Sequence, residues 1–286
     1  NKLWNIVYEK EYKNKYQLPR SKSLNINHKR LFSRGSFSPT LQDKRVSLFG
    51  CGALGSQIAE NLVRGGQKNI FLFDDDQILQ VNLCRHTLDG RDSGNSKSIS
   101  LCRRFQSINP FANVEAYYTS IPLLPSEVNE YKKLEESELL IDCTTDDAAL
   151  KWLNEFAISK NKRLITMFFD FYAEILTLII SGLEQNCLEI YNNLMVHIKN
   201  NKTNLDPKKY FYIPQKEEQI IEGIGCWHPT FPALNIHINL LANSALDIIN
   251  SHLKKSNGLA AIIKRNTNYL KTKSITELVY YNDDYK

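Results

Sequence analysis

Apolar residues follow two periods in turn along this chain, one typical of strands and one typical of helices. Short, almost continuous apolar runs predict buried strands at residues 45–50, 69–74, 113–121, 138–144, 163–171 and 174–182. Between the first two runs, apolar residues four positions apart predict a helix that buries Leu54, Ile58 and Leu62 and ends at Gly65-Gly66. This alternation predicts an α/β fold with a doubly wound, Rossmann-like sheet, mostly parallel and carrying an antiparallel extension.

Further helices continue the alternation between the later strands. One opens at Lys97 and ends at Asn109-Pro110, with a buried face predicted from Ile99, Cys102, Phe105 and Ile108. A short charged helix is predicted over residues 125–138 and a longer helix over residues 146–161.

The same pattern divides the chain into four parts. Residues 1–44 lack sustained periodicity, and their Gly, Pro and Ser content predicts a basic N-terminal arm or linker. Residues 45–182 hold the core of the sheet, and residues 183–233 form a crossover segment with a helix near 188–199. Residues 234–286 are predicted to complete the same domain as helix, beginning with an amphipathic helix that buries Leu234, Ile238, Leu241, Ala245 and Ile248.

Composition places the chain among ordinary globular proteins. Of its 286 residues, 42% are hydrophobic and 23% are charged. No apolar run approaches the ~20 residues that a membrane-spanning helix needs, so we do not expect a membrane protein. Because the chain begins at Asn1 with no signal-like stretch, we expect it to be a piece of a longer protein.

Charge and cysteine content indicate the expected partners and the cellular location. Residues 1–45 contain eleven Lys and Arg against three Asp and Glu. Such an arm could touch nucleic acid or an acidic partner, but a solvated flank is the preferred interpretation, and no nucleic acid is predicted as a partner. The six cysteines occur singly, without a Cys-x-x-Cys pair, which argues against a structural zinc site and a disulfide framework. A reducing cytoplasm is the expected location.

A glycine-rich turn follows the first predicted strand. Gly50, Gly52 and Gly55 in GCGALG fit the pattern G-x-G-x-x-G, in which the glycines permit a tight turn, close approach to a phosphate or ribose, and helix packing. Asp74 ends the second strand, where an acid commonly accepts hydrogen bonds from ribose hydroxyls. A nicotinamide-dependent dehydrogenase would share both features, whereas the absence of Gly-Lys-Ser/Thr excludes a P-loop.

A second set of polar residues favours a triphosphate over a dinucleotide. Residues 74–86 read DDDQILQVNLCRH, and Asn82, Arg85 and then Lys97 add an amide and two positive charges. Two cations suit the several negative charges of a triphosphate better than a bridging pyrophosphate that a helix N-terminus already satisfies. The pattern therefore favours ATP.

Five short motifs occur in a fixed order along the chain. They are Gly50-x-Gly52-x-x-Gly55, the spacing D-x-D-x5-N-x-x-R formed by Asp74, Asp76, Asn82 and Arg85, the segment Gly94 to Lys97, Ile108-Asn109-Pro110, and Asp142-Cys143-Thr144. Together they resemble the ubiquitin-activating superfamily of the ThiF/MoeB type, well over residues 44–182 and loosely elsewhere. Within it the chain looks most like the activating domains of bacterial ubiquitin-like conjugation and anti-phage systems.

The resemblance implies an activity and a role for each motif. Family members activate the C-terminal carboxylate of a small protein or peptide by attack on the α-phosphorus of ATP, which yields an acyl-adenylate and pyrophosphate. Residues 45–182 would be the adenylation core, in which Asp74 holds the ribose and Asp76 lies at the metal and phosphate side. The phosphates would be bound by Asn82, Arg85 and Lys97, and the last two are the predicted catalytic cations. Such a protein has mainly to exclude water, align the attack and neutralise charge.

One position departs from the family pattern. Where members carry a magnesium-binding aspartate after Cys-Thr, this chain has Thr145, followed by Asp146 and Asp147. Either Asp146 replaces that ligand after a shift of one residue, or Mg²⁺ is held differently, or adenylation is impaired. We favour Asp146 as the Mg²⁺ ligand because a strand-end loop can absorb one residue. The alternative is that Asp146 and Asp147 only cap the next helix.

A candidate thiol lies late in the chain. Family members that go beyond the adenylate pass the acyl group to a cysteine, and Cys226 lies in the Gly- and Pro-containing stretch GCWHPTFPA. Its neighbour His228 and the nearby helix start are circumstances that lower a thiol pKa. A packed turn anchored by Trp227 and Phe231 is the alternative.

The remaining candidates are given supporting roles. Cys51 and Cys143 are predicted core residues, and His86 is predicted to support the nucleotide loop rather than to act as a base. Two further cysteines are interpreted as incidental, Cys84 and Cys187. The resemblance raises the question whether Arg30 or Arg34 reaches the ATP of a second subunit, but exposed structural charges are the preferred interpretation.

The sequence thus predicts an ATP-dependent adenylyltransferase of ubiquitin-activating type that uses Mg²⁺ and forms a homodimer. Its partners would be a ubiquitin-like protein and a conjugating enzyme, and thioester transfer to Cys226 would follow adenylation. Two alternatives stay open. A ThiF-like peptide adenylyltransferase or RNA-base cyclase would need no thiol, and a nucleotide-binding scaffold that has lost its chemistry would account for Thr145.

Overall fold

The computed structural model describes residues 2–7, 9, 27–170, 172–200, 202–203, 205–211, 233–266 and 276–285. The chain falls into two compact units, residues 1–34 and residues 35–286. In the first unit lie α1 (Lys2–Val7) and α2 (His28–Leu31), and the Asn27 side chain caps α2 by accepting the Arg30 N–H at 2.9 Å. In these described ranges no helix is long and apolar enough to cross a membrane.

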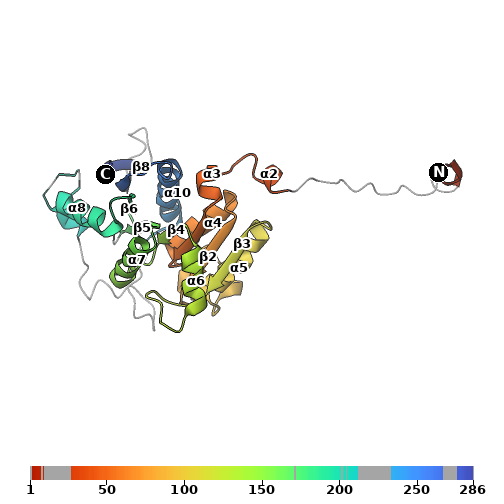
Figure 1. Ribbon diagram of the computed structural model, residues 1–286, viewed down its shortest axis with the longest axis horizontal. Helices are drawn as coiled ribbons and strands as arrows, with labels where there is room; N and C mark the ends of the chain where they lie inside the picture. Colours follow the sequence, from red (N-terminus) through yellow and green to blue (C-terminus); the bar gives the residue numbers. More distant parts are fainter. Residues whose placement is uncertain are drawn as a thin grey trace. The chain divides into compact units, whose positions relative to one another are not determined.

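One mixed sheet organises the described part of the second unit (Figure 1). Its eight strands lie in the order β3-β2-β1-β4-β5-β6-β7-β8. The parallel strands are β1 (Arg45–Phe49), β2 (Asn69–Phe73), β3 (Asn113–Tyr117), β4 (Leu139–Asp142) and β5 (Arg163–Phe169). The antiparallel extension is β6 (Ile175–Ile180), β7 (Gly258–Arg265) and β8 (Thr276–Tyr285). The order 3-2-1-4-5 is Rossmann-like, and the predicted fold class is confirmed.

Helices cover both faces of the sheet, as Figure 1 shows. One face carries α4 (Ala53–Arg64), α5 (Lys97–Ile108) and α10 (Asn235–His252). The other face carries α6 (Val128–Glu136), α7 (Asp147–Ser159) and α8 (Cys187–Lys199). Shorter turns complete the unit: α3 (Pro39–Gln42), η2 (Gln80–Asn82), η3 (Gly90–Asp92) and α9 (Pro207–Tyr210).

Strand residues alternate between the two helical layers. In β1, Val46 and Leu48 pack with α4, α5 and α10, whereas Phe49 packs in the opposite core with Phe71 of β2. Successive side chains of a strand point to opposite faces. A strand covered on both faces therefore needs the continuous apolar runs that the sequence shows.

The C-terminal part differs from the prediction. Helix is predicted over residues 234–286, and this is wrong beyond α10, because residues 258–265 and 276–285 form β7 and β8. The strand β7 reads GLAAIIKR, in which glycine and alanine weaken the strand signal. Its extended form comes from antiparallel pairing with β6 along Leu259 to Lys264. Tertiary pairing thus overrides a weak local preference.

Two helices bury a different set of residues from the one predicted. On α5, Ile99 is exposed, while Leu101 and Phe105 are fully buried. The inward stripe begins one position earlier than expected, because the first turn of α5 buries Lys97 and Ser98. Before α10, Leu234 is exposed because it is the N-cap residue rather than part of the helix; the predicted residues that are buried are Ile238, Leu241 and Ala245.

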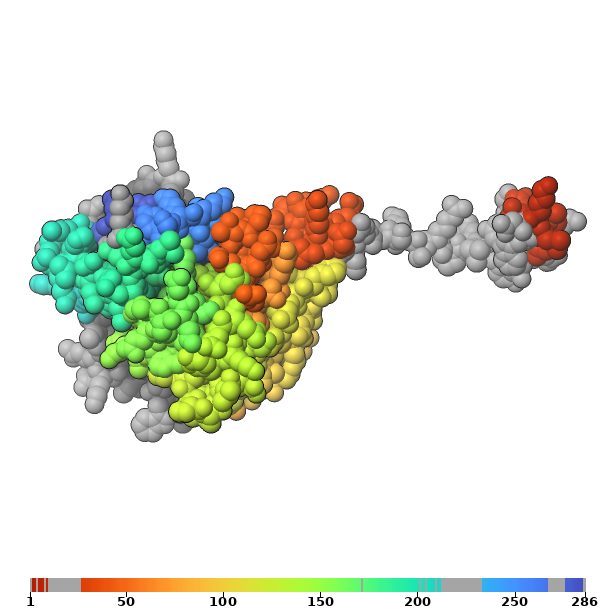
Figure 2. All heavy atoms as spheres, in the orientation of Figure 1, coloured from red at the N-terminus to blue at the C-terminus, as the bar shows by residue number. Residues whose placement is uncertain are grey.

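The compact unit begins before the predicted boundary at residue 45. Leu41 is fully buried in the core cluster that also contains residues of α4 and α10. The Phe37 N–H donates to the Gly65 carbonyl oxygen at 3.0 Å, and the Ser38 N–H donates to Asn250 Oδ1 at 2.8 Å. In Figure 2 the orange surface of this segment adjoins the blue surface of α10. Residues 35–44 therefore belong to the fold.

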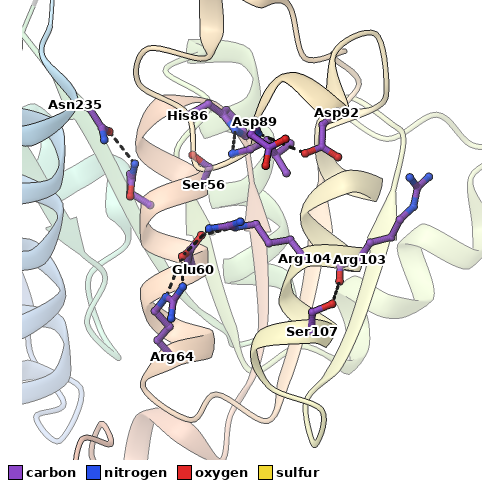
Figure 3. A network of polar contacts seen from close by, with 12 residues as sticks. Ser56, Glu60, Arg64, His86, Asp89, Asp92, Arg103, Arg104, Ser107 and Asn235 are labelled. Carbon is purple, nitrogen blue, oxygen red and sulfur yellow. Dashed lines mark hydrogen bonds and ion pairs between the residues drawn. The ribbon is translucent and has the colours of Figure 1, made fainter.

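A charged network joins α4 to α5 (Figure 3). Glu60 on α4 accepts hydrogen bonds from Arg104 Nε at 2.8 Å and from Arg64 Nε at 2.9 Å. Burial raises the pKa of Glu60, but the bonds from Arg104 and Arg64 outweigh burial and hold the pKa below its ordinary value. The network holds α5, which begins at Lys97, against the helix that follows the glycine turn.

Candidate functional site

Three parallel strands end side by side at the edge of the sheet where the candidate site lies. In register, Phe49 of β1 lies between Phe73 of β2 and Asp142 of β4. Gly50 and Asp74 follow β1 and β2 directly. The strand order reverses at β1, and open α/β sheets bind ligands at such a switch point.

Close backbone contacts shape the glycine turn after β1. Gly50 has a φ of +80°, which favours glycine, and a Cβ there would lie 2.8 Å from the Cys143 carbonyl carbon. A Cβ on Gly55 would lie 1.8 Å from the Gly50 carbonyl oxygen, so α4 could not pack at its present distance. A Cβ on Gly52 would meet no protein atom within 4 Å. Packing of the chain therefore requires the first and third glycines but not the second.

Asp74 connects the glycine turn to the loop after β2. Its Oδ2 accepts the Cys51 N–H at 2.6 Å, and its Oδ1 accepts the Asp76 N–H at 2.9 Å. Burial raises the pKa of this carboxyl above its ordinary value, although Lys97 and the two backbone bonds oppose the shift. A carboxylate has about four lone-pair sites, so Asp74 can also accept bonds from hydroxyl groups.

Lys97 begins α5 and is bound to the same loop. Its Nζ lies 2.6 Å from Asp76 Oδ2, and its N–H donates to the Asp76 carbonyl oxygen at 3.0 Å. The Lys97 side chain is 10% exposed and that of Asp76 is 69% exposed. The ammonium is therefore fixed in place, and it is close enough to Asp74 to lower the pKa of that carboxyl.

The loop between β2 and α5 folds around the turn η2. The Asn82 Oδ1 accepts the Leu79 N–H at 2.9 Å, so this side chain caps the turn. The N–H groups of Arg85 and His86 both donate to the Asn82 carbonyl oxygen, at 3.1 Å and 3.0 Å. Arg85 is half-buried on this turn. Asn82 thus shapes the loop, while phosphate contacts by Asn82 and Arg85 stay predictions.

The segment after β4 carries a buried carboxylate. Asp142 accepts hydrogen bonds from Thr144 Oγ1 at 2.7 Å and from Thr166 Oγ1 at 2.9 Å. Burial raises the pKa of the Asp142 carboxyl, and the bonds from both threonines oppose this. The carboxylate holds the end of β4 to β5 and to the loop that follows.

Thr145 and Asp146 follow in that loop. Thr145 has a φ of 58°, a left-handed conformation that is costly for a β-branched residue. Asp146 is exposed, and its Oδ1 accepts the Ala149 N–H at 2.7 Å as the N-cap of α7. Asp146 therefore does cap the helix, and its role toward magnesium stays a prediction.

Exposed carboxylates at this sheet edge are the candidate ligands for Mg²⁺. Among the residues that the structure describes, no group of three or more His, Cys, Asp and Glu could hold a metal ion. Nucleotide enzymes often hold Mg²⁺ with one or two carboxylates together with phosphates and water. Asp146 and Asp76 are exposed carboxylates that follow β4 and β2 at the same sheet edge, and they fit that arrangement.

Comparison with known proteins agrees with this geometry. Residues 25–222 match the ThiF family. The chain belongs to the ThiF family. The resemblance to ThiF/MoeB-type adenylyltransferases, inferred above from the motifs, is confirmed.

Two relatives of this ThiF-family chain have informative names. It is 31% identical over 212 residues to the ATP-dependent ubiquitin transferase-like protein Cap2 of Enterobacter hormaechei subsp. hoffmannii, covering 74% of this chain and 33% of Cap2. It is 30% identical over 118 residues to the adenylyltransferase and sulfurtransferase UBA4 of Yarrowia lipolytica, covering 41% of this chain and 29% of UBA4. The chain spans about a third of the length of these curated relatives.

A solved structure shares the fold of the ThiF-family chain. The crystal structure of E. coli MccB with ATP matches with a TM-score of 0.55 and 17% sequence identity. The match covers 85% of this chain and 64% of MccB. At this level of identity the likeness concerns the fold.

The described thiols of the ThiF-family chain lie in different surroundings. Cys51 and Cys143 are buried, as predicted, and burial raises the pKa of both thiols well above the ordinary value. Neither is thus suited to act as a nucleophile. Cys187 is buried and Cys84 is exposed. Cys226 and its neighbours through residue 232 lie outside the described residues, so the candidate thiol stays a prediction.

Most of the predicted site residues lie close together. Hydrogen bonds link Asp74 to the glycine turn, Asp74 to Asp76, and Asp76 to Lys97. Arg85 follows on the same loop, between β2 and α5. Arg30 and Arg34 are exposed residues of the first unit, and their role stays a prediction.

Two contacts at this site were not predicted. Asp142 and Thr166 lie opposite each other on β4 and β5, and only the strand register reveals that they meet. The His86 ring reaches the Cys51 carbonyl oxygen, 35 residues earlier, at 2.7 Å. The sequence identified His86 as a support of the loop, but it carries no signal for this partner.

Proposed function

We propose that this chain is an ATP-dependent adenylyltransferase that activates the C-terminal carboxylate of a ubiquitin-like protein, or of a protein modified in a similar way. The observation that supports it most is the hydrogen-bonded chain from the glycine turn through Asp74 and Asp76 to Lys97. It holds an acid for the ribose and a cation for the phosphates within reach of one nucleotide. The name of Cap2, a ubiquitin transferase-like protein, supports this class of substrate.

The described residues account for nucleotide binding. Asp74 accepts hydrogen bonds from the ribose hydroxyls. The N–H groups at the start of α4, beside Gly52, have no side-chain cap and can donate to a phosphate. Lys97 and Arg85 neutralise negative charge that develops on the phosphates during the reaction.

The chemical step needs no base on the enzyme. A carboxylate oxygen of the acyl substrate forms a bond to the α-phosphorus, the bond from that phosphorus to the bridging oxygen breaks, and pyrophosphate leaves with the electron pair. A carboxylate is already ionised at neutral pH, so alignment and charge neutralisation supply the acceleration. Mg²⁺, held by Asp146 together with the phosphates, would add to that neutralisation.

The proposal extends to a larger assembly. In a second step the Cys226 thiolate would attack the acyl carbon and release AMP, and a conjugating enzyme would accept the acyl group from the thioester. A homodimer and a cytoplasmic location complete the proposal. The described cysteines are all free thiols, which agrees with a reducing compartment.

Pyrophosphate exchange into ATP tests the adenylation step. We expect exchange that requires both the chain and a small protein ending in glycine, and that falls at least ~100-fold in Lys97→Ala and Arg85→Ala. Exposed residues of matched charge serve as controls, Lys151→Ala and Arg103→Ala, which should retain full exchange. Exchange that survives the loss of both Lys97 and Arg85 would rule out the proposed site, and tight binding of a nicotinamide cofactor would rule out the reaction.

A peptide adenylyltransferase is the second candidate. It would use the same hydrogen-bonded chain from the glycine turn through Asp74 and Asp76 to Lys97. Such an enzyme, or an RNA-base cyclase, needs no thioester, so Cys226→Ala would retain all activity. Under the main proposal Cys226→Ala should still exchange pyrophosphate but should form no covalent, thiol-sensitive adduct with the acyl substrate.

A scaffold without chemistry is the third candidate. Thr145, which has a left-handed backbone conformation, stands where the family carries an aspartate, and this favours a scaffold. A scaffold would bind ATP at Asp74 and Lys97 but would not exchange pyrophosphate with any acyl substrate. Calorimetry of ATP binding, measured together with pyrophosphate exchange, distinguishes a scaffold from an adenylating enzyme.

A further inference from the structure

His86 and Asp74 bond the two backbone polar groups of one residue in the glycine turn, Cys51. The His86 Nε2 lies 2.7 Å from the Cys51 carbonyl oxygen, and Asp74 Oδ2 accepts the Cys51 N–H at 2.6 Å. Cys51 stands between Gly50 and Gly52, two residues with few conformational restraints of their own. Both backbone polar groups of the central residue are therefore bonded to side chains that follow β2.

The contacts of the ring specify its tautomer. The Leu88 N–H donates to Nδ1 at 3.0 Å, so Nδ1 carries a lone pair and the proton lies on Nε2, which donates to Cys51. An imidazolium would carry a proton on Nδ1 as well and would lose the Leu88 bond. Only the neutral ring satisfies both contacts.

The surroundings of His86 favour that neutral form. The residue is 7% exposed, and burial lowers the pKa of the imidazole to about 4. The Cys51 bond and Asp92 oppose this shift in the pKa, whereas Lys97 and Arg104 reinforce it. The ring is therefore neutral throughout the physiological range of pH.

Because the His86 ring is anchored, the backbone of the preceding residue, Arg85, is held in place as well. Arg85 and His86 are adjacent, and both of their N–H groups donate to the Asn82 carbonyl oxygen. The bond from the ring to Cys51 therefore sets the distance between this turn and the glycine turn. Both ring nitrogens bind backbone groups, so the ring has no donor or acceptor left for a nucleotide.

We propose that His86 is a positioning residue, which holds the Arg85 backbone against the glycine turn so that both elements meet one triphosphate. This inference rests on the proposed function in one respect, namely that the site binds a triphosphate. The contact of His86 with Cys51, and not simply its bulk, carries the role.

Three substitutions separate the two ring contacts. In His86→Gln the amide nitrogen takes the place of Nε2 and keeps the bond to Cys51. In His86→Asn the shorter side chain reaches only the place of Nδ1 and can accept the Leu88 N–H, and His86→Ala makes neither bond. We expect the KM for ATP in pyrophosphate exchange to rise about tenfold in the Asn and Ala variants, the effect of one lost hydrogen bond. The Gln variant should stay within about threefold of the parent, and kcat should change less than KM.

Equal KM values in the Gln, Asn and Ala variants, at temperatures where circular dichroism shows all of them folded, would reduce His86 to a packing residue. Restoration of the parent KM by Gln alone supports the contact with Cys51.

A ligand-free measurement keeps this test apart from the proposed function. In ¹⁵N spectra of the full chain, we expect the His86 proton on Nε2 and no titration of the ring between about pH 8 and 5. Titration near the ordinary value of about 6.5 would overturn the inference whatever the nucleotide does. Conversely, a neutral, anchored ring in a chain that binds no ATP would count against the proposed function and leave the geometry of His86 intact.

Discussion

The Lys97 ammonium lies 2.6 Å from the Asp76 carboxylate, and of these two side chains only Asp76 is open to solvent. Under the proposed function, a triphosphate that enters the site would meet a cation that is already held in place. In the nucleotide-free protein, Asp76 balances the charge of Lys97, so the ammonium is not left unpaired. A bound phosphate would take the place of Asp76 as the partner of this cation.

Loss of the Lys97 cation should affect catalysis more than folding. Lys97→Arg retains charge but replaces a compact ammonium with a planar fork, so we expect intermediate exchange rates, between the parent and Lys97→Ala. Steady-state exchange and urea unfolding should be measured on the same samples. An Ala variant that loses all of its exchange only because it unfolds would contradict this expectation.

The first and third glycines of the turn differ from the second in what they contact. Gly55→Ala should destabilise the protein by at least about 3 kcal/mol, because its Cβ would lie 1.8 Å from the Gly50 carbonyl oxygen. The Cβ of Gly52→Ala would meet no protein atom within 4 Å, so the free energy of unfolding should change by less than about 1 kcal/mol. The affinity for ATP should nevertheless fall. Urea unfolding measures the stability of the two variants, and calorimetric titration measures their affinity for ATP. An unchanged affinity in Gly52→Ala would show that no ligand approaches this backbone.

Asp146 has a structural role that can be separated from a magnesium role. An asparagine keeps the acceptor that caps α7 at Ala149, so Asp146→Asn should leave stability within about 0.5 kcal/mol of the parent. If Asp146 holds Mg²⁺, the same variant needs a higher Mg²⁺ concentration for half-maximal exchange. Asp146→Ala should lose about 1 kcal/mol of stability in addition. An unchanged Mg²⁺ dependence in Asp146→Asn would leave this residue with the cap alone.

Thr145 stores backbone strain in the loop between β4 and α7. Its φ of 58° suits glycine far better than a β-branched residue. Thr145→Gly should therefore raise the unfolding free energy by about 1 kcal/mol, although the extra freedom of glycine in the unfolded chain offsets part of the gain. Chemical denaturation measures the change, and destabilisation would mean that the bond from Thr145 Oγ1 to the Thr144 carbonyl oxygen outweighs the strain.

Stability should fall as the pH is lowered from about 6.5 to about 4. In this window the unfolded chain protonates His86, whereas burial lowers the pKa of the folded imidazole to about 4. The contribution of His86 is fully present above the unfolded pKa, and about 3 kcal/mol of it is lost by pH 4.

The matched variant for this effect is His86→Gln. Burial also lowers the pKa values of His237 and His252, so the slope of the parent alone does not isolate His86. The difference in unfolding free energy between parent and His86→Gln should shrink steadily as the pH falls through the window. Parallel profiles would contradict the neutral, buried ring.

Short-range patterns predicted the parallel half of the fold well. Gly50 and Gly55 were predicted correctly because their geometry depends on a single strand-turn-helix unit. Asp74 is predicted as the acid at the end of the second strand, and the structure places it there, directly after β2, where it accepts the Cys51 N–H of the glycine turn. The strands β7 and β8 were missed because their extended form depends on pairing with a distant strand.

The sequence by itself determined the alternation of strands and helices from β1 to β6, the glycine turn and the acid at the end of β2, because each of these follows from residues a few positions apart. Tertiary structure alone decided that Thr166 bonds Asp142, that His86 reaches Cys51 and that Lys97 is paired with Asp76. Such contacts join segments 21 to 35 residues apart. Their existence depends on strand register and loop path, which no local pattern of apolar and polar residues encodes.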